Sequence, residues 1–85
     1  MPKARVTKII DGDTFKIPGK SIRLANVYAP EKGTKGGAKA KGELKDMIGD
    51  KTISYKPVGK SYNRVVAQVK IGGKSVNQGM RNKLR

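Results

Sequence analysis

The stretch "IIDGDTFKIPGKSIRL", residues 9–24, decides the fold of this chain. Apolar and polar side chains alternate at 14–17 and again at 22–25, which is typical of strands with one buried face. The "DGD" and "PGK" triplets between these segments predict tight turns, and Gly12 is expected to accept the positive φ that such a turn requires. The stretch therefore predicts three successive strands joined by hairpins.

The segments on either side extend this pattern. Residues 4–10 alternate as well, so the first strand is expected to begin near the N-terminus. Downstream, apolar residues recur at helical spacing, then at strand spacing, and finally every four residues. In chain order, these features predict a flexible basic loop at 32–37, a helix at 38–50, a strand from residue 53, a loop at 57–63, a strand at 65–71 and a short helix at 76–84.

Five short strands with a helix between the third and the fourth are the pattern of a small OB-type barrel. We therefore predict a mainly β fold of the α+β class, a five-stranded OB-fold barrel with that helix and a short C-terminal helix. A chain of 85 residues has room for one thin core, so residues 1–85 are expected to form a single domain.

Charge is the most pronounced feature of the composition: 20 Lys and Arg stand against 6 Asp and Glu, a formal net charge of +14. Such a surface attracts polyanions, and nucleic acid, DNA or RNA, is the partner it indicates. The alternative is a charge that serves only solubility or heat resistance. Because the chain has no His and no Cys, any metal must bind through oxygen, which favours Ca²⁺ or Mg²⁺.

No apolar run approaches the ~20 residues of a membrane span, so no membrane partner is expected. The basic start, "MPKARVTKII", leads directly into a strand pattern without a signal-peptide apolar region. We therefore expect a cytoplasmic protein, although a chain whose leader has been removed would look the same.

Three segments contain residues that could carry chemistry. Asp11 and Asp13 in the turn are either plain turn residues or ligands of a hard cation. Arg23 is out of phase with its apolar neighbours and should leave the core, as should Arg64 at the start of the cleanest strand. Two arginines on neighbouring strands near a carboxylate turn could clamp one phosphate. Tyr62 could stack on a base or sit at the barrel rim.

Together these segments resemble the staphylococcal-nuclease-like (thermonuclease) domain family. "DGDT" at a hairpin, "RL" running to "PE", and Tyr-x-Arg before the last barrel strand occur here in the family's order. "GGKSVN" is similar to the family's entry into its second helix, so the resemblance extends from about Val6 to Asn82. It implies a Ca²⁺-dependent phosphodiesterase acting on DNA and RNA, with an OB barrel as its fold.

The resemblance also implies roles for individual residues. Asp13 would be a metal ligand supported by Asp11, and Ala29 would offer its backbone carbonyl to the metal. Glu31 would orient or deprotonate the attacking water, while Arg23 and Arg64 would neutralise the phosphate as its negative charge grows. The expected nucleic-acid-binding residues are Tyr62, Lys60, Lys35 and Lys32.

This chain departs from the family pattern at the metal site. Tyr28-Ala29 stands where the family has Asp-Thr before "PE", and a phenol with a pKa of ~10 cannot replace an anionic ligand near neutral pH. Ser61 stands where the family has a basic residue, although Lys60 is adjacent. We therefore expect a weakened metal site. The family's C-terminal extension has no counterpart in this sequence, so part of the usual nucleotide pocket is expected to be either absent or supplied by a second subunit, in a monomer or a weak homodimer.

Two hypotheses follow from these observations. The first is a metal-dependent nuclease, favoured by Glu31, because a carboxylate gives a plain polyanion binder no advantage in its phosphate groove. The second is a non-catalytic basic OB-fold module that binds nucleic acid, favoured by Tyr28 and by the charge. A ribosomal-type basic OB protein is a weaker third, since the chain has few aromatic residues for stacking.

Overall fold

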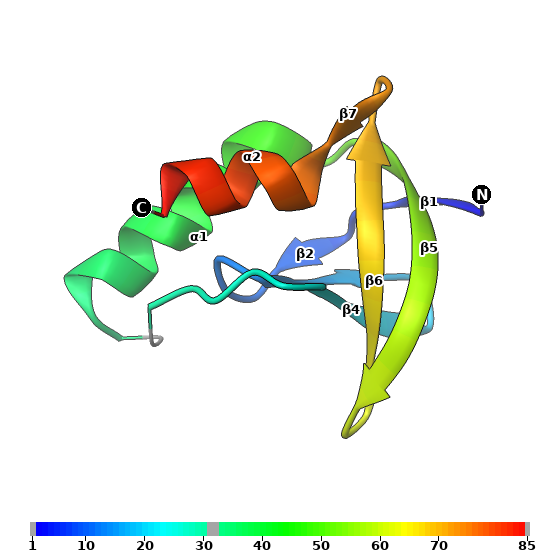
Figure 1. Ribbon diagram of the computed structural model, residues 1–85, viewed down its shortest axis with the longest axis horizontal. Helices are drawn as coiled ribbons and strands as arrows, with labels where there is room; N and C mark the ends of the chain where they lie inside the picture. Colours follow the sequence, from blue (N-terminus) through cyan, green and yellow to red (C-terminus); the bar gives the residue numbers. More distant parts are fainter. Residues whose placement is uncertain (1, 31–32, 85) are drawn as a thin grey trace.

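The computed structural model describes residues 2–30 and 33–84 (Figure 1). Two helices lie side by side on one side of a strongly curled sheet (Figure 1). The elements are, in chain order, β1 (Lys3–Arg5), β2 (Lys8–Ile9), β3 (Thr14–Ile17), β4 (Lys20–Leu24), α1 (Lys35–Ile48), β5 (Thr52–Ser61), β6 (Arg64–Ile71), β7 (Lys74–Ser75) and α2 (Val76–Lys83).

The sheet curls into a barrel because the first and last strands in its spatial order belong to the same N-terminal segment. The strand order is β1-β5-β6-β4-β3-β2, and β1 and β2 are the two halves of one strand that bends at Val6 and Thr7. At the bend, Val6 N–H donates to the Lys51 carbonyl at 2.9 Å and Thr7 N–H to the Lys16 carbonyl at 2.8 Å. With β4 and β6 parallel and the other barrel pairs antiparallel, the predicted five-stranded OB-type fold is confirmed.

The core lies between the inner face of the sheet and the two helices. Phe15, Ile22 and Leu24 from β3 and β4 are completely buried, as the alternation predicts. The helices cover them with an apolar stripe from α1, including Leu44, and with Met80 from α2. An ion pair of 2.9 Å between Glu43 on α1 and Lys83 on α2 joins the two helices at the surface.

Two boundaries differ from the prediction. Helix α1 begins at Lys35, inside the expected loop 32–37, because the Thr34 side chain accepts a hydrogen bond from Gly37 N–H at 2.9 Å and caps the helix there. The expected loop at 57–63 is wrong: β5 continues to Ser61, with a register shift between Pro57 and Gly59. A strand containing proline and glycine tolerates such a bulge, and pairing with β6 holds it in the sheet.

Within the described ranges 2–30 and 33–84, neither helix has the length and apolar character needed to cross a membrane.

Candidate active site

The "DGD" turn packs tightly against helix α1 and the segment that leaves β4. Ile10 N–H and Asp11 N–H both donate to the Thr14 carbonyl, at 3.0 and 3.1 Å, which closes the β2–β3 hairpin as predicted. The expected reason for Gly12 is wrong, since its φ lies outside the left-handed region. Instead, a Cβ at Gly12 would stand 2.9 Å from the Ala29 Cβ and collide with Ala40 of α1. Glycine is required here for close approach, which fixes the turn relative to the helix.

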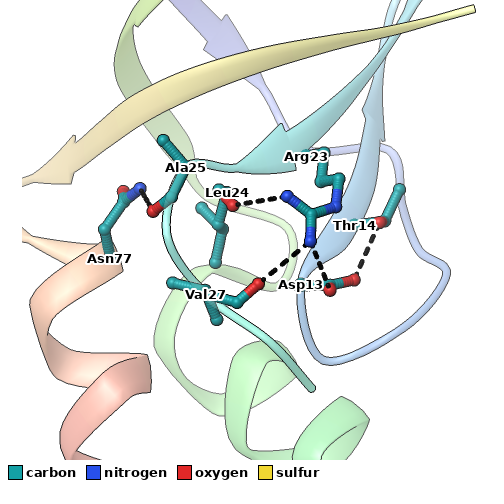
Figure 2. Close-up of polar contacts among 7 residues, drawn as sticks. All are labelled: Asp13, Thr14, Arg23, Leu24, Ala25, Val27 and Asn77. Atoms are coloured by element: carbon teal, nitrogen blue, oxygen red, sulfur yellow. Dashed lines mark hydrogen bonds and ion pairs between the residues drawn. The ribbon is translucent and has the colours of Figure 1, made fainter. Parts of the chain in front are cut away.

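Asp13 and Arg23 form an ion pair between the start of β3 and the end of β4 (Figure 2). Asp13 Oδ2 lies 3.6 Å from Arg23 Nη2, and the other carboxylate oxygen accepts a hydrogen bond from Thr14 Oγ1 at 3.0 Å. The backbones are joined as well, because Leu24 N–H donates to the Asp13 carbonyl at 2.8 Å. The two side chains are 15% and 21% exposed, so both remain accessible to a ligand.

Three further contacts fix the Arg23 guanidinium. Its Nη2 lies 3.3 Å from the Val27 carbonyl and its Nη1 lies 3.5 Å from the Leu24 carbonyl, the second at the limit of a hydrogen bond (Figure 2). The Tyr28 ring, 78% exposed, lies against the guanidinium, with 5.6 Å from Arg23 Cζ to the ring centre. The chain turns back toward Arg23 at Asn26, whose φ is +58°. Tyr28, the residue that departs from the family pattern, therefore borders the site.

Arg64 lies on the strand next to Arg23 and on the same face of the sheet. Ser21 on β4 pairs with Arg64 on β6, and Arg23 follows Ser21 by two residues, so their side chains leave the same face. Strand rise and spacing put the two arginine Cα atoms about 8 Å apart. In the described part of the chain Arg64 is half-buried and has no ion-pair partner.

Tyr62 and Lys60 lie at the tip of the β5–β6 hairpin. Tyr62 is 92% exposed, with a φ of +56°, and so belongs to the rim rather than the core. Both line a hollow of about 390 Å³ together with Arg64 and the Gly19–Lys20 turn. A basic hollow with an exposed ring suits a phosphate and its nucleotide. Lys35 lies in the first turn of α1 and is not among the residues that line this hollow.

Few oxygen donors that a hard cation could use lie around the "DGD" turn in the described ranges. Asp13 and Asp11 share one turn, and Ala29 approaches that turn at Gly12. Residues 2–30 and 33–84 contain no cluster of three carboxylates that could hold a metal. Glu31 and Lys32, expected as catalytic and nucleic-acid-binding residues, lie outside the described residues. Since Ca²⁺ takes ~6–8 oxygens, a Ca²⁺ ion at this turn would need several further oxygens from water or from a substrate phosphate.

Sequence reasoning missed the groups that hold the site in position. Thr14 and the Val27 carbonyl orient Asp13 and Arg23, and Asn77 of α2 binds the backbone of the segment leaving β4 (Figure 2). Backbone acceptors carry no sequence signal. Asn77 gives a weak signal in the sequence, because a polar residue adjoins the apolar stripe that begins at Val76.

Comparisons with known proteins match most of the chain. The family model described as "Staphylococcal nuclease homologue" matches residues 21–83. A protein of Haemophilus influenzae named "Uncharacterized endonuclease" is 37% identical over 79 residues, an alignment that covers 86% of this chain. It covers 44% of that protein, so the chain spans less than half the length of this relative.

Proposed function

Because this chain belongs to the staphylococcal nuclease homologue family, we propose that it is a nuclease that hydrolyses phosphodiester bonds in DNA or RNA. We propose Ca²⁺ as its cofactor, with Mg²⁺ as the alternative, since the available ligands are all oxygen atoms. The proposed substrate agrees with the formal charge of +14, which draws polyanions to the surface.

The observation that carries the proposal is the ion pair between Asp13 and Arg23, 3.6 Å apart and accessible on one side. A divalent cation on Asp13 would stand close to a guanidinium and be repelled by it. A phosphate bound between the two would remove this repulsion, since its oxygens can contact both positive charges. Arg64 on the neighbouring strand, without an ion-pair partner in the described part of the chain, could contact the same phosphate.

Each residue then has a distinct proposed role. Arg23 and Arg64 bind the scissile phosphate and stabilise the negative charge that develops on it during hydrolysis. Glu31 orients the attacking water and accepts its proton. Asp13, Asp11 and the Ala29 carbonyl would hold the cation, which would polarise the phosphate when bound. The nucleic acid on either side of the cleaved bond is held by Tyr62, Lys60, Lys35 and Lys32.

We propose that the metal site is weak in the free protein because Tyr28 stands at its border in place of a carboxylate. The Tyr28 ring lies beside the Arg23 guanidinium and adds no negative charge there. With one anionic ligand fewer, the cation depends more on the substrate phosphate for its coordination.

The test compares cleavage of single-stranded DNA, double-stranded DNA and RNA in Ca²⁺, in Mg²⁺ and in chelator. We expect cleavage that chelator abolishes and that Glu31→Ala reduces by about 10²–10⁴-fold, the usual contribution of a general base. Binding should persist in this variant. Glu43→Ala removes a glutamate from the surface of α1 instead, and we expect it to cleave normally. Equal rates in the two variants would contradict the assignment of Glu31.

The second candidate, a binding module without catalysis, is favoured by one observation: Arg23 is already engaged by Asp13 and by the Tyr28 ring. In that case the Asp13–Arg23 pair would only position a phosphate, and Asp11 and Asp13 would be turn residues that hold no metal. Nucleic-acid binding that chelator leaves unchanged, with no cleavage in either cation, would favour this candidate over the nuclease.

A further inference from the structure

A basic groove runs between the bent N-terminal strand and helix α1, and its lining includes none of the residues assigned a role above. It is a hollow of about 320 Å³, with Val6 and Ile9 among its lining residues. Lys8 of β2 and Lys41 and Lys45 of α1 line the same hollow, and we call it the lysine groove. The two helix lysines are four residues apart and therefore neighbours on one face of α1.

The lysine groove adjoins the proposed active site. A second hollow, of about 270 Å³, is lined by Ile10 and Asp11 of the "DGD" turn and by the first turn of α1. Lys41 lines both hollows, and Ile9 and Ile10 are consecutive residues in the two walls. Because they share Lys41, the two hollows are neighbours along the seam between β2 and α1, a path with Asp11 in one hollow and Lys45 in the other.

The positive charge of the lysine groove is not used within the described part of the chain. Residues 2–30 and 33–84 provide no ion-pair partner for Lys8, Lys41 or Lys45. Asp50 is the acidic residue in the lining, so the three lysines leave an excess of two positive charges. Such an excess in a hollow that is partly apolar favours a ligand with repeated negative charges and some apolar surface.

We propose that the lysine groove binds the sugar–phosphate backbone of a single nucleic-acid strand whose next segment lies in the active site. This inference rests on the proposed function, because the path has a direction only if Asp11 and Asp13 mark the site of cleavage. A duplex is too wide to follow a hollow of this size, whereas a single strand can place successive phosphates beside the three lysines. The groove would therefore set how many nucleotides beyond the cleaved bond contribute to binding.

The test is a set of matched charge variants. The groove variant carries Lys8→Gln, Lys41→Gln and Lys45→Gln. The control variant carries Lys56→Gln, Lys70→Gln and Lys74→Gln, three exposed lysines of β5, β6 and β7 that line neither hollow. Both variants lose three positive charges, so they share any effect of net charge. The probe is a fluorescent 12-nucleotide oligothymidylate, bound in chelator so that no cleavage occurs, over a range of salt concentrations.

We expect the groove variant to bind the 12-mer about tenfold more weakly at low salt. Its slope of log K against log salt should fall by about 2, since each lost phosphate contact on a single strand accounts for ~0.7. The control variant should lose less than half as much in both measurements. In Ca²⁺, KM for the 12-mer should rise more than KM for a dinucleotide, whose single internucleotide phosphate cannot occupy the active site and the lysine groove together.

The outcomes separate the two proposals. Equal losses in the groove and control variants would overturn the inference, whether or not the protein cleaves nucleic acid. A protein that never cleaves in either cation would overturn the proposed nuclease, while the binding measurement would still decide on the groove. Circular dichroism of both variants checks that they are folded, and all six lysines are exposed, so their replacement leaves the core intact.

Discussion

Replacing Asn77 with alanine should strongly destabilise the fold, because this side chain joins three segments of backbone. Its Oδ1 accepts a hydrogen bond from Val69 N–H at 2.8 Å, and its Nδ2 donates to the Ala25 and Ala67 carbonyls at 2.9 and 3.1 Å. The side chain is completely buried. It thus ties α2 both to β6 and to the segment that leads from β4 toward Val27, whose carbonyl binds Arg23.

The size of the effect follows from the groups left without a partner. The Ala67 carbonyl keeps a second donor, Ala25 N–H at 2.9 Å, so its loss is small. Val69 N–H and the Ala25 carbonyl lose the partner that Asn77 supplies. Each buried group left without a partner lowers the free energy of unfolding by about 1–3 kcal/mol. We expect a loss of about 3 kcal/mol, out of roughly 4–13 kcal/mol for a domain of this length. The melting temperature should fall by roughly 12–24 °C.

Urea and thermal unfolding followed by far-ultraviolet circular dichroism measure this loss, since the chain has no tryptophan for fluorescence. Asn82→Ala is the matched control: it is the same substitution on the same helix, but Asn82 is exposed and accepts one hydrogen bond from Gln78 Nε2 at 3.1 Å. Any gain in helix propensity is common to both variants. If Asn77→Ala costs no more than Asn82→Ala, the reasoning about buried hydrogen bonds is refuted.

Three shorter predictions follow. Tyr28→Asp should tighten Ca²⁺ binding and raise activity by restoring an anionic ligand, and calorimetry that finds the affinity unchanged would show that residue 28 does not reach the metal. Gly12→Ala should lower the free energy of unfolding in urea by about 1–3 kcal/mol, because the added Cβ clashes with Ala40. Adding Ala40→Gly should restore only part of this free energy, because Ala29 still crowds the new Cβ and because glycine weakens the helix. Full recovery would mean that Ala29 exerts no steric pressure. The hydrogen bond and charge of Lys83 lower the pKa of Glu43 below its ordinary 4.5, and the same contact raises the pKa of Lys83 above 10.5. Their pair therefore stabilises the fold between those limits, and is lost as the pH falls through the pKa of Glu43 or rises through that of Lys83. Thermal melts should accordingly show Lys83→Met slightly destabilised near pH 7 but equal to the parent near pH 2.

Most of the fold could be predicted because its signals are local. Alternation at 14–17 and 22–25 and helical spacing after residue 38 identified the elements, and burial of Phe15 and Leu44 confirms the faces they assign. The continuation of β5 through 57–63 could not be predicted, because a Pro-Gly-rich stretch favours a loop unless a neighbouring strand supplies its hydrogen bonds. The bend that divides β1 from β2 likewise depends on which two strands the segment pairs with.

The candidate site was predictable in its residue types but not in its contacts. Arg23 was expected to leave the core, and it does, but the sequence contains nothing to indicate that the Val27 carbonyl and the Tyr28 ring hold it. The turn was expected from "DGD", yet the need for Gly12 arises from Ala40, 28 positions later in the chain. Contacts of this kind depend on how distant segments meet, which a single sequence leaves open.

The high positive charge also bears on how metal and substrate would bind together. A surface with a net charge of +14 repels a divalent cation and attracts nucleic acid, so the two ligands affect each other through the field as well as through contact. In the proposed nuclease, a bound strand would reduce the positive field around Asp13 and could offer phosphate oxygens to the metal, where Tyr28 offers no charge. By thermodynamic linkage, if the bound strand raises the affinity for the metal by some factor, the bound metal raises the affinity for the strand by the same factor. Metal affinity measured on the free protein would then be lower than the affinity during hydrolysis, and a weak site in isolation is compatible with an active nuclease.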